Sequence, residues 1–181
     1  LFQRSGCAGS QHYTTSFGGD SYSCFLGLKR SVWQMLSAAA SGFSIWGSDL
    51  GGYMLREWMP QEGPRYEELY IRWVQFSAFS ALMRDHSCQG KHHPWTNGER
   101  GLANFKYYYA LRLQLLDAIY SSALQCKKEG GSVADSMAIA YNMSPSVDMQ
   151  YMFCKDFLVR PVVEEGQRTA EILFPEDGFY S

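Results

Sequence analysis

Short apolar segments that end in polar residues and glycine alternate with helical stretches along most of the chain. Apolar residues recur at helical spacing from Leu26 to Ala39, and an apolar strand that ends in Gly47-Ser48-Asp49 follows. A second helical pattern, from Leu69 to Phe79, leads into a strand near Leu82-Met83 that ends in Arg84-Asp85-His86. Such an alternation predicts an α/β fold with a parallel sheet covered by helices.

The pattern changes after a third helical stretch. Apolar residues at intervals of three and four predict one helix from Tyr108 to Ala123, followed by the helix-ending residues Lys127-Lys128 and Gly130-Gly131. From Val133 onward, apolar residues come in short bursts between turn-forming residues, which is typical of β-structure. We therefore expect a βα unit over residues 1–130 and the start of an all-β unit over residues 131–181, with the boundary near Gly130.

Composition excludes several classes of protein. The net charge of −2, with mixed signs, argues against a nucleic-acid surface, which needs concentrated Lys and Arg. No apolar run approaches the roughly 18 residues of a membrane span. The five cysteines include no CxxC pair, and the histidines at 86, 92 and 93 match no standard metal spacing. We expect no metal, no other cofactor, no nucleic acid and no membrane partner.

Charged residues gather after the expected strands. Arg4 follows the opening apolar residues, and Asp20 ends the segment Phe17-Gly18-Gly19-Asp20. In a parallel barrel, the loops after the strands carry the active site. A carboxyl group beside an arginine suits a polyhydroxylated substrate. The residues expected to converge there are Arg4, Asp20, Asp49, Tyr53, Arg84 and His86.

Several motifs, in order and spacing, resemble glycoside hydrolase family 31, which includes α-glucosidases and α-xylosidases. They are Arg4 to Asp20, Gly47 to Tyr53, Arg72-Trp73-Val74-Gln75-Phe76, Arg84-Asp85-His86, Pro94-Trp95, Gln150-Tyr151-Met152 and Leu158 to Val162. The resemblance implies the C-terminal portion of a (β/α)8 TIM barrel, with its last three strands, followed by the start of a β-sandwich domain. The chain lacks an initial methionine, so we expect it to be an internal part of a longer protein.

The resemblance also implies roles for individual residues. Asp20 matches the catalytic acid/base, and the nucleophilic aspartate is expected upstream of Leu1 with the rest of the barrel. Arg4 and His86 match residues that hydrogen-bond sugar hydroxyls. Phe17 stands where tryptophan is usual, which keeps a wall for the sugar but removes the indole donor. Tyr53 matches an aromatic residue that lines the same pocket.

Asp49 and Arg84 are expected to support the site. Asp49, at a strand end, is expected to orient Arg4 or His86 without touching the sugar, and Arg84 is expected to pair with a carboxylate. Structural alternatives stay open at this point: Asp20 could cap a helix, Arg4 could form a structural ion pair, and His86 could be a core histidine.

The function implied is that of a retaining α-glycosidase acting on terminal α-glucosidic bonds of an oligosaccharide or other α-glucoside. Retention requires two carboxyl groups about 5–5.5 Å apart. The alternatives are relatives with another specificity, namely an α-xylosidase, a sulfoquinovosidase or an α-glucan lyase. A non-catalytic sugar-binding or structural subunit is a further alternative.

Overall fold

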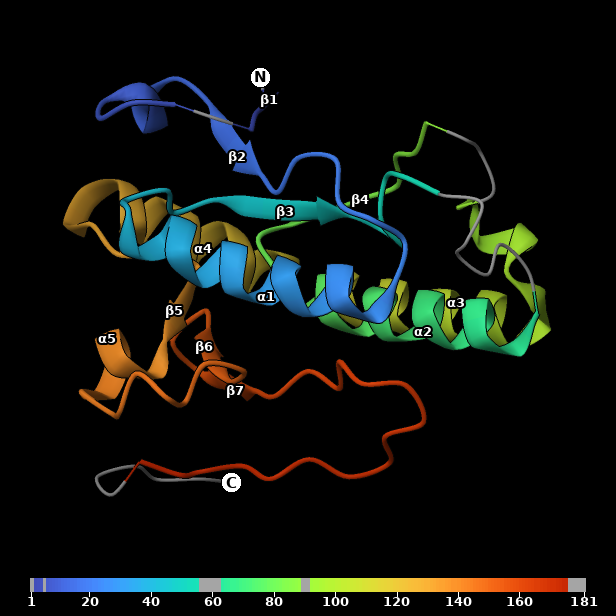
Figure 1. Cartoon of the computed structure of the whole chain (residues 1–181). Helices are drawn as coiled ribbons and strands as arrows, with labels where there is room; N and C mark the ends of the chain where they lie inside the picture. The colour runs from blue at the N-terminus through green and yellow to red at the C-terminus, as the bar shows by residue number, and fades with distance from the viewer. Residues whose placement is uncertain (1, 5, 56–62, 89–91, 176–181) are drawn as a thin grey trace.

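The first part of the chain forms a four-stranded parallel sheet (Figure 1). The computed structural model describes residues 2–4, 6–55, 63–88 and 92–175. The strands, in sheet order, are β1 (Phe2–Gln3), β2 (Thr15–Phe17), β3 (Trp46–Asp49) and β4 (Leu82–Arg84). All neighbouring pairs are parallel, which confirms the predicted sheet. Leu1, at the start of the expected first strand, lies outside the described residues.

The sheet differs from the expectation in one strand. The resemblance implies three strands, and no strand is expected just before Asp20. Thr15–Phe17 instead forms β2, with Ser16 pairing with Gln3 of β1 and with Trp46 of β3. Three residues are too few to show a strand period, so this strand is specified by its two neighbours and not by its own sequence.

Helices α1 (Phe25–Ala40) and α2 (Pro64–Ala78) confirm the first two helical patterns. At the start of α1, the Cys24 side chain accepts a hydrogen bond from the Gly27 N–H, and α2 begins with the proline that suits a first helical position. Both helices lie along the same side of the sheet in Figure 1. Short 3-10 helices also occur, η1 (Ser10–His12) and η2 (Pro94–Thr96).

The third helical pattern forms two helices where one was expected. They are α3 (Gly98–Gln114) and α4 (Leu116–Glu129), and α3 packs against α2. The break falls at Leu115, whose N–H bonds to the carbonyls of both Leu111 and Arg112. No glycine or proline marks this position, so the sequence pattern does not predict the break.

After α4 the chain forms a three-stranded antiparallel sheet. Its strands are β5 (Ala134–Ser136), β6 (Tyr151–Phe153) and β7 (Phe157–Val159), in that order. The expectation of all-β structure missed helix α5 (Met137–Tyr141), which starts where the Ser136 hydroxyl accepts from the Ile139 N–H. The bursts around Val163 and Leu173 form no strand, although both segments are described.

One hydrophobic core joins the two sheets. Leu28 of α1, Trp73 of α2 and Tyr151 of β6 are fully buried members of the same cluster. Two hydrogen bonds link the β5–β7 sheet to the chain just ahead of the parallel strands: Val133 N–H donates to the Ser44 carbonyl at 3.2 Å, and the Tyr151 hydroxyl donates to the Phe79 carbonyl at 2.8 Å. The β5–β7 unit therefore attaches at the amino ends of β3 and β4.

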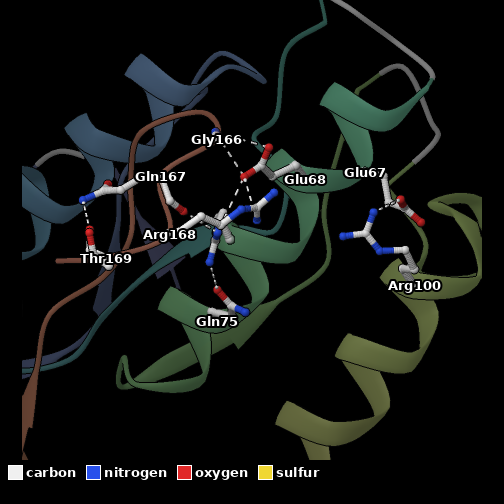
Figure 2. Close-up of polar contacts among 9 residues, drawn as sticks. Glu67, Glu68, Gln75, Arg100, Gly166, Gln167, Arg168 and Thr169 are labelled. Atoms are coloured by element: carbon white, nitrogen blue, oxygen red, sulfur yellow. Dashed lines mark hydrogen bonds and ion pairs between the residues drawn. The ribbon is translucent and has the colours of Figure 1, made fainter.

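The segment after β7 returns along α1 and α2 (Figure 1). Lys29 of α1 forms a 2.7 Å ion pair with Glu164. On α2, Glu68 accepts hydrogen bonds from the Gly166 N–H at 3.2 and 3.3 Å (Figure 2). Arg72 of the same helix donates to the Gln167 carbonyl at 2.8 Å. This return segment fixes the β5–β7 unit against the outer helices.

Within the described residues, no helix is both long enough and apolar enough to cross a bilayer. The same part of the chain contains no group of three or more His, Cys, Asp or Glu side chains suited to a metal ion.

Candidate active site

The residues proposed for the site lie at the carboxyl ends of the four parallel strands. Arg4 follows β1, Phe17 ends β2, Asp49 ends β3 and Arg84 ends β4. Asp49 and Arg84 are paired residues of the β3–β4 register, so their side chains leave the sheet at the same level. This is the end at which parallel α/β barrels place their active sites.

Arg4 and Asp20 face each other across the loops that follow β1 and β2. Arg4 Nη1 lies 2.8 Å from Asp20 Oδ2, and both side chains are accessible to solvent, with Asp20 39% exposed. The ion pair is made through Oδ2, so Oδ1 lies outside it. Gly19 precedes it with a φ of 74°, a left-handed backbone that disfavours other residues. The ion pair leaves one carboxyl oxygen available for a ligand.

Asp49, at the end of β3, is buried and bonds to Arg84. Arg84 Nε donates to Asp49 Oδ1 at 2.6 Å, and the Asp49 side chain is completely inaccessible to solvent. This contact confirms that Arg84 pairs with a carboxylate. The predicted role of Asp49 needs a change, because its hydrogen-bonded partner is Arg84 and not Arg4 or His86.

Electrostatics place Asp20 and His86 near Asp49. Burial raises the pKa of Asp49, while the Arg84 hydrogen bond and the charges of Arg84 and His86 act in the opposite direction. The negative charge of Asp20 raises this pKa further. Asp49 Oδ2 is buried with no hydrogen-bond partner in the described part of the chain. The three side chains therefore belong to one electrostatic cluster.

Tyr53 and His86, from the loops after β3 and β4, lie against each other. Their ring centroids are 5.1 Å apart with a 31° angle between planes; Tyr53 is half-buried and His86 is exposed. Backbone hydrogen bonds tie the loops that carry them: Tyr53 N–H donates to Ser21 O at 2.8 Å, and Cys88 N–H donates to Tyr53 O at 3.2 Å. The loops after β2, β3 and β4 thus form one continuous rim.

The structure bears on the alternative roles of these residues. Asp20 does not cap α1, because Cys24 occupies that position. His86 is exposed and is therefore not a core histidine. The buried histidine is His92, which lies 3.1 Å from the Leu50 carbonyl and whose pKa is lowered by burial. Arg4 does form an ion pair, and its partner is the proposed catalytic residue.

Sequence reasoning missed the position of Phe2. The guanidinium carbon of Arg84 lies 5.2 Å from the centroid of the Phe2 ring and 4.4 Å from that of Phe17. Arg84 thus contacts aromatic rings from β1 and β2 while bonding to Asp49 of β3. An aromatic residue in the opening strand was the available signal, but the strand order was needed to place it.

A cavity of about 430 Å³ lies between β2 and α1 and touches Arg4, Phe17 and Trp46. Asp20, Asp49 and His86 do not line it. The cavity thus shares Arg4 and Phe17 with the cluster at the strand ends but does not contain its carboxylates, and we take the cluster as the candidate site.

Comparison with protein-family models gives two adjacent matches. Residues 1–122 match the model described as the glycosyl hydrolases family 31 TIM-barrel domain. Residues 130–181 match the model described as the glycosyl hydrolase family 31 C-terminal domain. The expected fold class, a C-terminal portion of a (β/α)8 barrel followed by the start of the next domain, is confirmed. The boundary near Gly130 stays a prediction.

Curated relatives match nearly the whole chain but only part of their own length. An α-xylosidase of Emericella nidulans is 31% identical over 169 residues, which is 91% of this chain and 20% of that protein. An α-glucosidase of Hordeum vulgare is 29% identical over 99% of this chain and 20% of that protein. A sulfoquinovosidase of Escherichia coli is 31% identical over 99% of this chain and 27% of that protein. The chain thus spans about a fifth to a quarter of the length of these relatives.

Solved structures give the same result. The cycloalternan-forming enzyme of Listeria monocytogenes, in complex with a pentasaccharide substrate, superposes with a TM-score of 0.82 at 34% identity, covering 92% of this chain and 16% of that one. An α-xylosidase from a soil metagenome, complexed with xylose, superposes with a TM-score of 0.84 at 27% identity. The match covers 92% of this chain and 28% of that one.

Proposed function

The chain belongs to glycoside hydrolase family 31, and from this premise we propose that it is part of a retaining α-glycosidase that hydrolyses terminal α-glucosidic bonds. Asp20 is the proposed acid/base. The nucleophilic carboxylate and the rest of the barrel are expected from the part of the protein upstream of Leu1.

One observation carries the proposal: the Arg4–Asp20 pair lies at the strand ends together with Phe17, Asp49 and His86. Glycoside hydrolysis needs a proton donor, hydrogen bonds to hydroxyl groups and a surface for the apolar face of the ring. Asp20, Arg4 with His86, and Phe17 with Tyr53 are chemically suited to these three tasks. They come from the ends of consecutive strands and from the loops that follow those strands.

In the first step, Asp20 gives its proton to the glycosidic oxygen while the nucleophile attacks the anomeric carbon. Oδ1 is the oxygen suited to this transfer, because Oδ2 already faces Arg4 at 2.8 Å. In the second step, the Asp20 carboxylate takes a proton from water, which then attacks the glycosyl-enzyme and restores the configuration of the substrate. Both steps use the same oxygen in opposite directions.

Arg4 and His86 bind hydroxyl groups of the sugar in this proposal. Charge-assisted hydrogen bonds are stronger than neutral ones, and they gain strength as positive charge develops on the ring in an oxocarbenium-like transition state. Phe17 and Tyr53 contribute walls to the sugar pocket.

An α-xylosidase is the second candidate, because a relative with that name is 31% identical and a structural neighbour holds xylose. Glucose differs from xylose by one hydroxymethyl group on C5, so the choice depends on whether the complete pocket has room and hydrogen-bond partners for that group.

The proposed function is tested on the full-length protein with aryl α-glucoside and aryl α-xyloside. We expect hydrolysis of the glucoside to be faster, with the α-anomer released first, as seen by proton NMR before mutarotation. Release of the β-anomer first would contradict double displacement. Faster hydrolysis of the xyloside would assign the second candidate, and turnover of neither substrate would favour a non-catalytic role.

His86→Ala in the full-length enzyme is expected to lower kcat/KM by a factor of about 10 to 150, since a hydrogen bond to a charged group contributes about 1.5–3 kcal/mol. The fold should survive because His86 is exposed. Steady-state kinetics measure the loss. His93→Ala is the matched control: His93 is 54% exposed and pairs with Asp85, outside the proposed sugar contacts. Equal kcat/KM values for the two variants and the wild type would remove His86 from the site.

A further inference from the structure

Arg84 holds together groups from all four parallel strands, and the mechanism above does not use it. It ends β4, donates to Asp49 of β3 at 2.6 Å, and lies over the rings of Phe17 of β2 and Phe2 of β1 at 4.4 and 5.2 Å. Only 22% of its side chain is exposed. A partly buried cation with one carboxylate and two aromatic partners has a defined orientation, because each contact restrains a different direction.

The anchor of this arrangement is Asp49. Its side chain has no solvent exposure and sits on a strand whose four residues are all buried, so it has little freedom to move. The Asp49 backbone is also paired in register with Arg84. The carboxylate can therefore set the position of the guanidinium. The half-buried Phe17 ring lies next to that guanidinium, 4.4 Å from its carbon.

We propose that Arg84 is a positioning residue that acts through Phe17: held by Asp49, its planar guanidinium fixes the tilt of the Phe17 ring against which the sugar packs. This inference rests on the proposed function. It names the residue that determines the orientation of one wall of the sugar pocket.

The chemistry of the partners explains why arginine is required. Guanidinium is planar, stacks on aromatic rings and still donates hydrogen bonds in its own plane. Lysine keeps the charge but has no plane, so it cannot stack on Phe17 and bond to Asp49 in the same geometry. Arg84→Lys therefore removes the restraint while leaving the positive charge beside the buried Asp49.

The test is a double-mutant cycle in the full-length enzyme with wild type, Arg84→Lys, Phe17→Ala and the double variant. We expect Arg84→Lys alone to lower kcat/KM by on the order of 10-fold, and by less than about 2-fold in the Phe17→Ala background. A purely structural role would give the same loss in both backgrounds, and that result would overturn the proposal. Arg100→Lys is the matched control, since Arg100 is 71% exposed and pairs with Glu67 at 3.4 Å (Figure 2).

A second measurement tests whether Arg84 acts on the sugar or on proton transfer to the leaving group. Because Phe17 contacts the sugar and not the departing group, Arg84→Lys should reduce kcat/KM by equal factors for substrates with good and poor leaving groups. A loss confined to poor leaving groups would show that Arg84 acts on proton transfer by Asp20, and would also overturn the proposal.

Asp49→Asn keeps the inference testable if Arg84→Lys does not fold. It preserves the shape of the side chain and weakens its hold on Arg84, so we expect a smaller loss that again disappears in the Phe17→Ala background. The two proposals fail in different ways. An inactive wild-type enzyme would reject the proposed function, whereas an active wild type with additive losses would reject only the role of Arg84.

Discussion

Asp20→Ala in the full-length enzyme is expected to lower kcat/KM on substrates with poor leaving groups by a factor of about 10² to 10⁴, the range for loss of a general acid. Aryl glycosides with strongly acidic phenols depart without protonation, so their first step should lose much less. Steady-state kinetics on both substrate types measure the difference. The accessible position of Asp20 means that the change should not affect folding.

Azide provides a second test of the same residue. Without a base at position 20, hydrolysis of the glycosyl-enzyme becomes slow, but azide attacks the anomeric carbon without needing to lose a proton. Added azide should therefore accelerate the Asp20→Ala variant and give a glycosyl azide that retains the substrate configuration. Asp117→Ala, an exposed aspartate on α4, should behave as the wild type. Equal losses on both substrate types, with no glycosyl azide, would reject Asp20 as the acid/base.

Arg112→Met is expected to destabilise the protein by about 1–3 kcal/mol, the cost of leaving a buried hydrogen-bonding group without its partner. Arg112 of α3 donates to the carbonyls of Ala78, Ser80 and Ala81, at and just beyond the end of α2, at 2.7 to 2.9 Å, with a longer contact to Ser77. Burial lowers the pKa of Arg112. Methionine keeps the stem but leaves these carbonyls without their donor.

Thermal unfolding of the full-length protein measures this effect as a lower Tm. Arg100→Met is the control on the same helix, because Arg100 is 71% exposed and its ion pair with Glu67 is weak in water. We expect a change within about 0.5 kcal/mol for the control. Equal Tm values for the two variants would show that the carbonyls after α2 are satisfied without Arg112.

Long periodic segments made most of the fold predictable from the sequence. The apolar stripes of α1 and α2 cover several turns, so their helical period is clear, and the apolar runs at Trp46 and Leu82 are bounded by turn residues. Shorter features escaped prediction. The three residues of β2 and the five of α5 carry no measurable period, and the break at Leu115 depends on packing between helices.

For the candidate site, the sequence indicated at which end of the sheet the residues lie, but not which side chains contact each other. Polar residues after apolar strands indicated one shared end of the sheet, and the structure brings Arg4, Asp20 and Asp49 there. Which side chains touch could not be inferred, because Phe2 and Arg84 are far apart in the sequence. Their contact depends on the order of the strands and on the register of β3 with β4.

The two ends of the parallel strands are connected to different parts of the molecule. Ser44 and Phe79, ahead of β3 and β4, accept hydrogen bonds from the β5–β7 unit, whereas Asp49 and Arg84, at the far ends of the same strands, support the site. A substitution at Ser44 or Phe79 is therefore expected to act first on the attachment of the β5–β7 unit, because the contacts of Asp49 and Arg84 lie at the opposite ends of the same two strands.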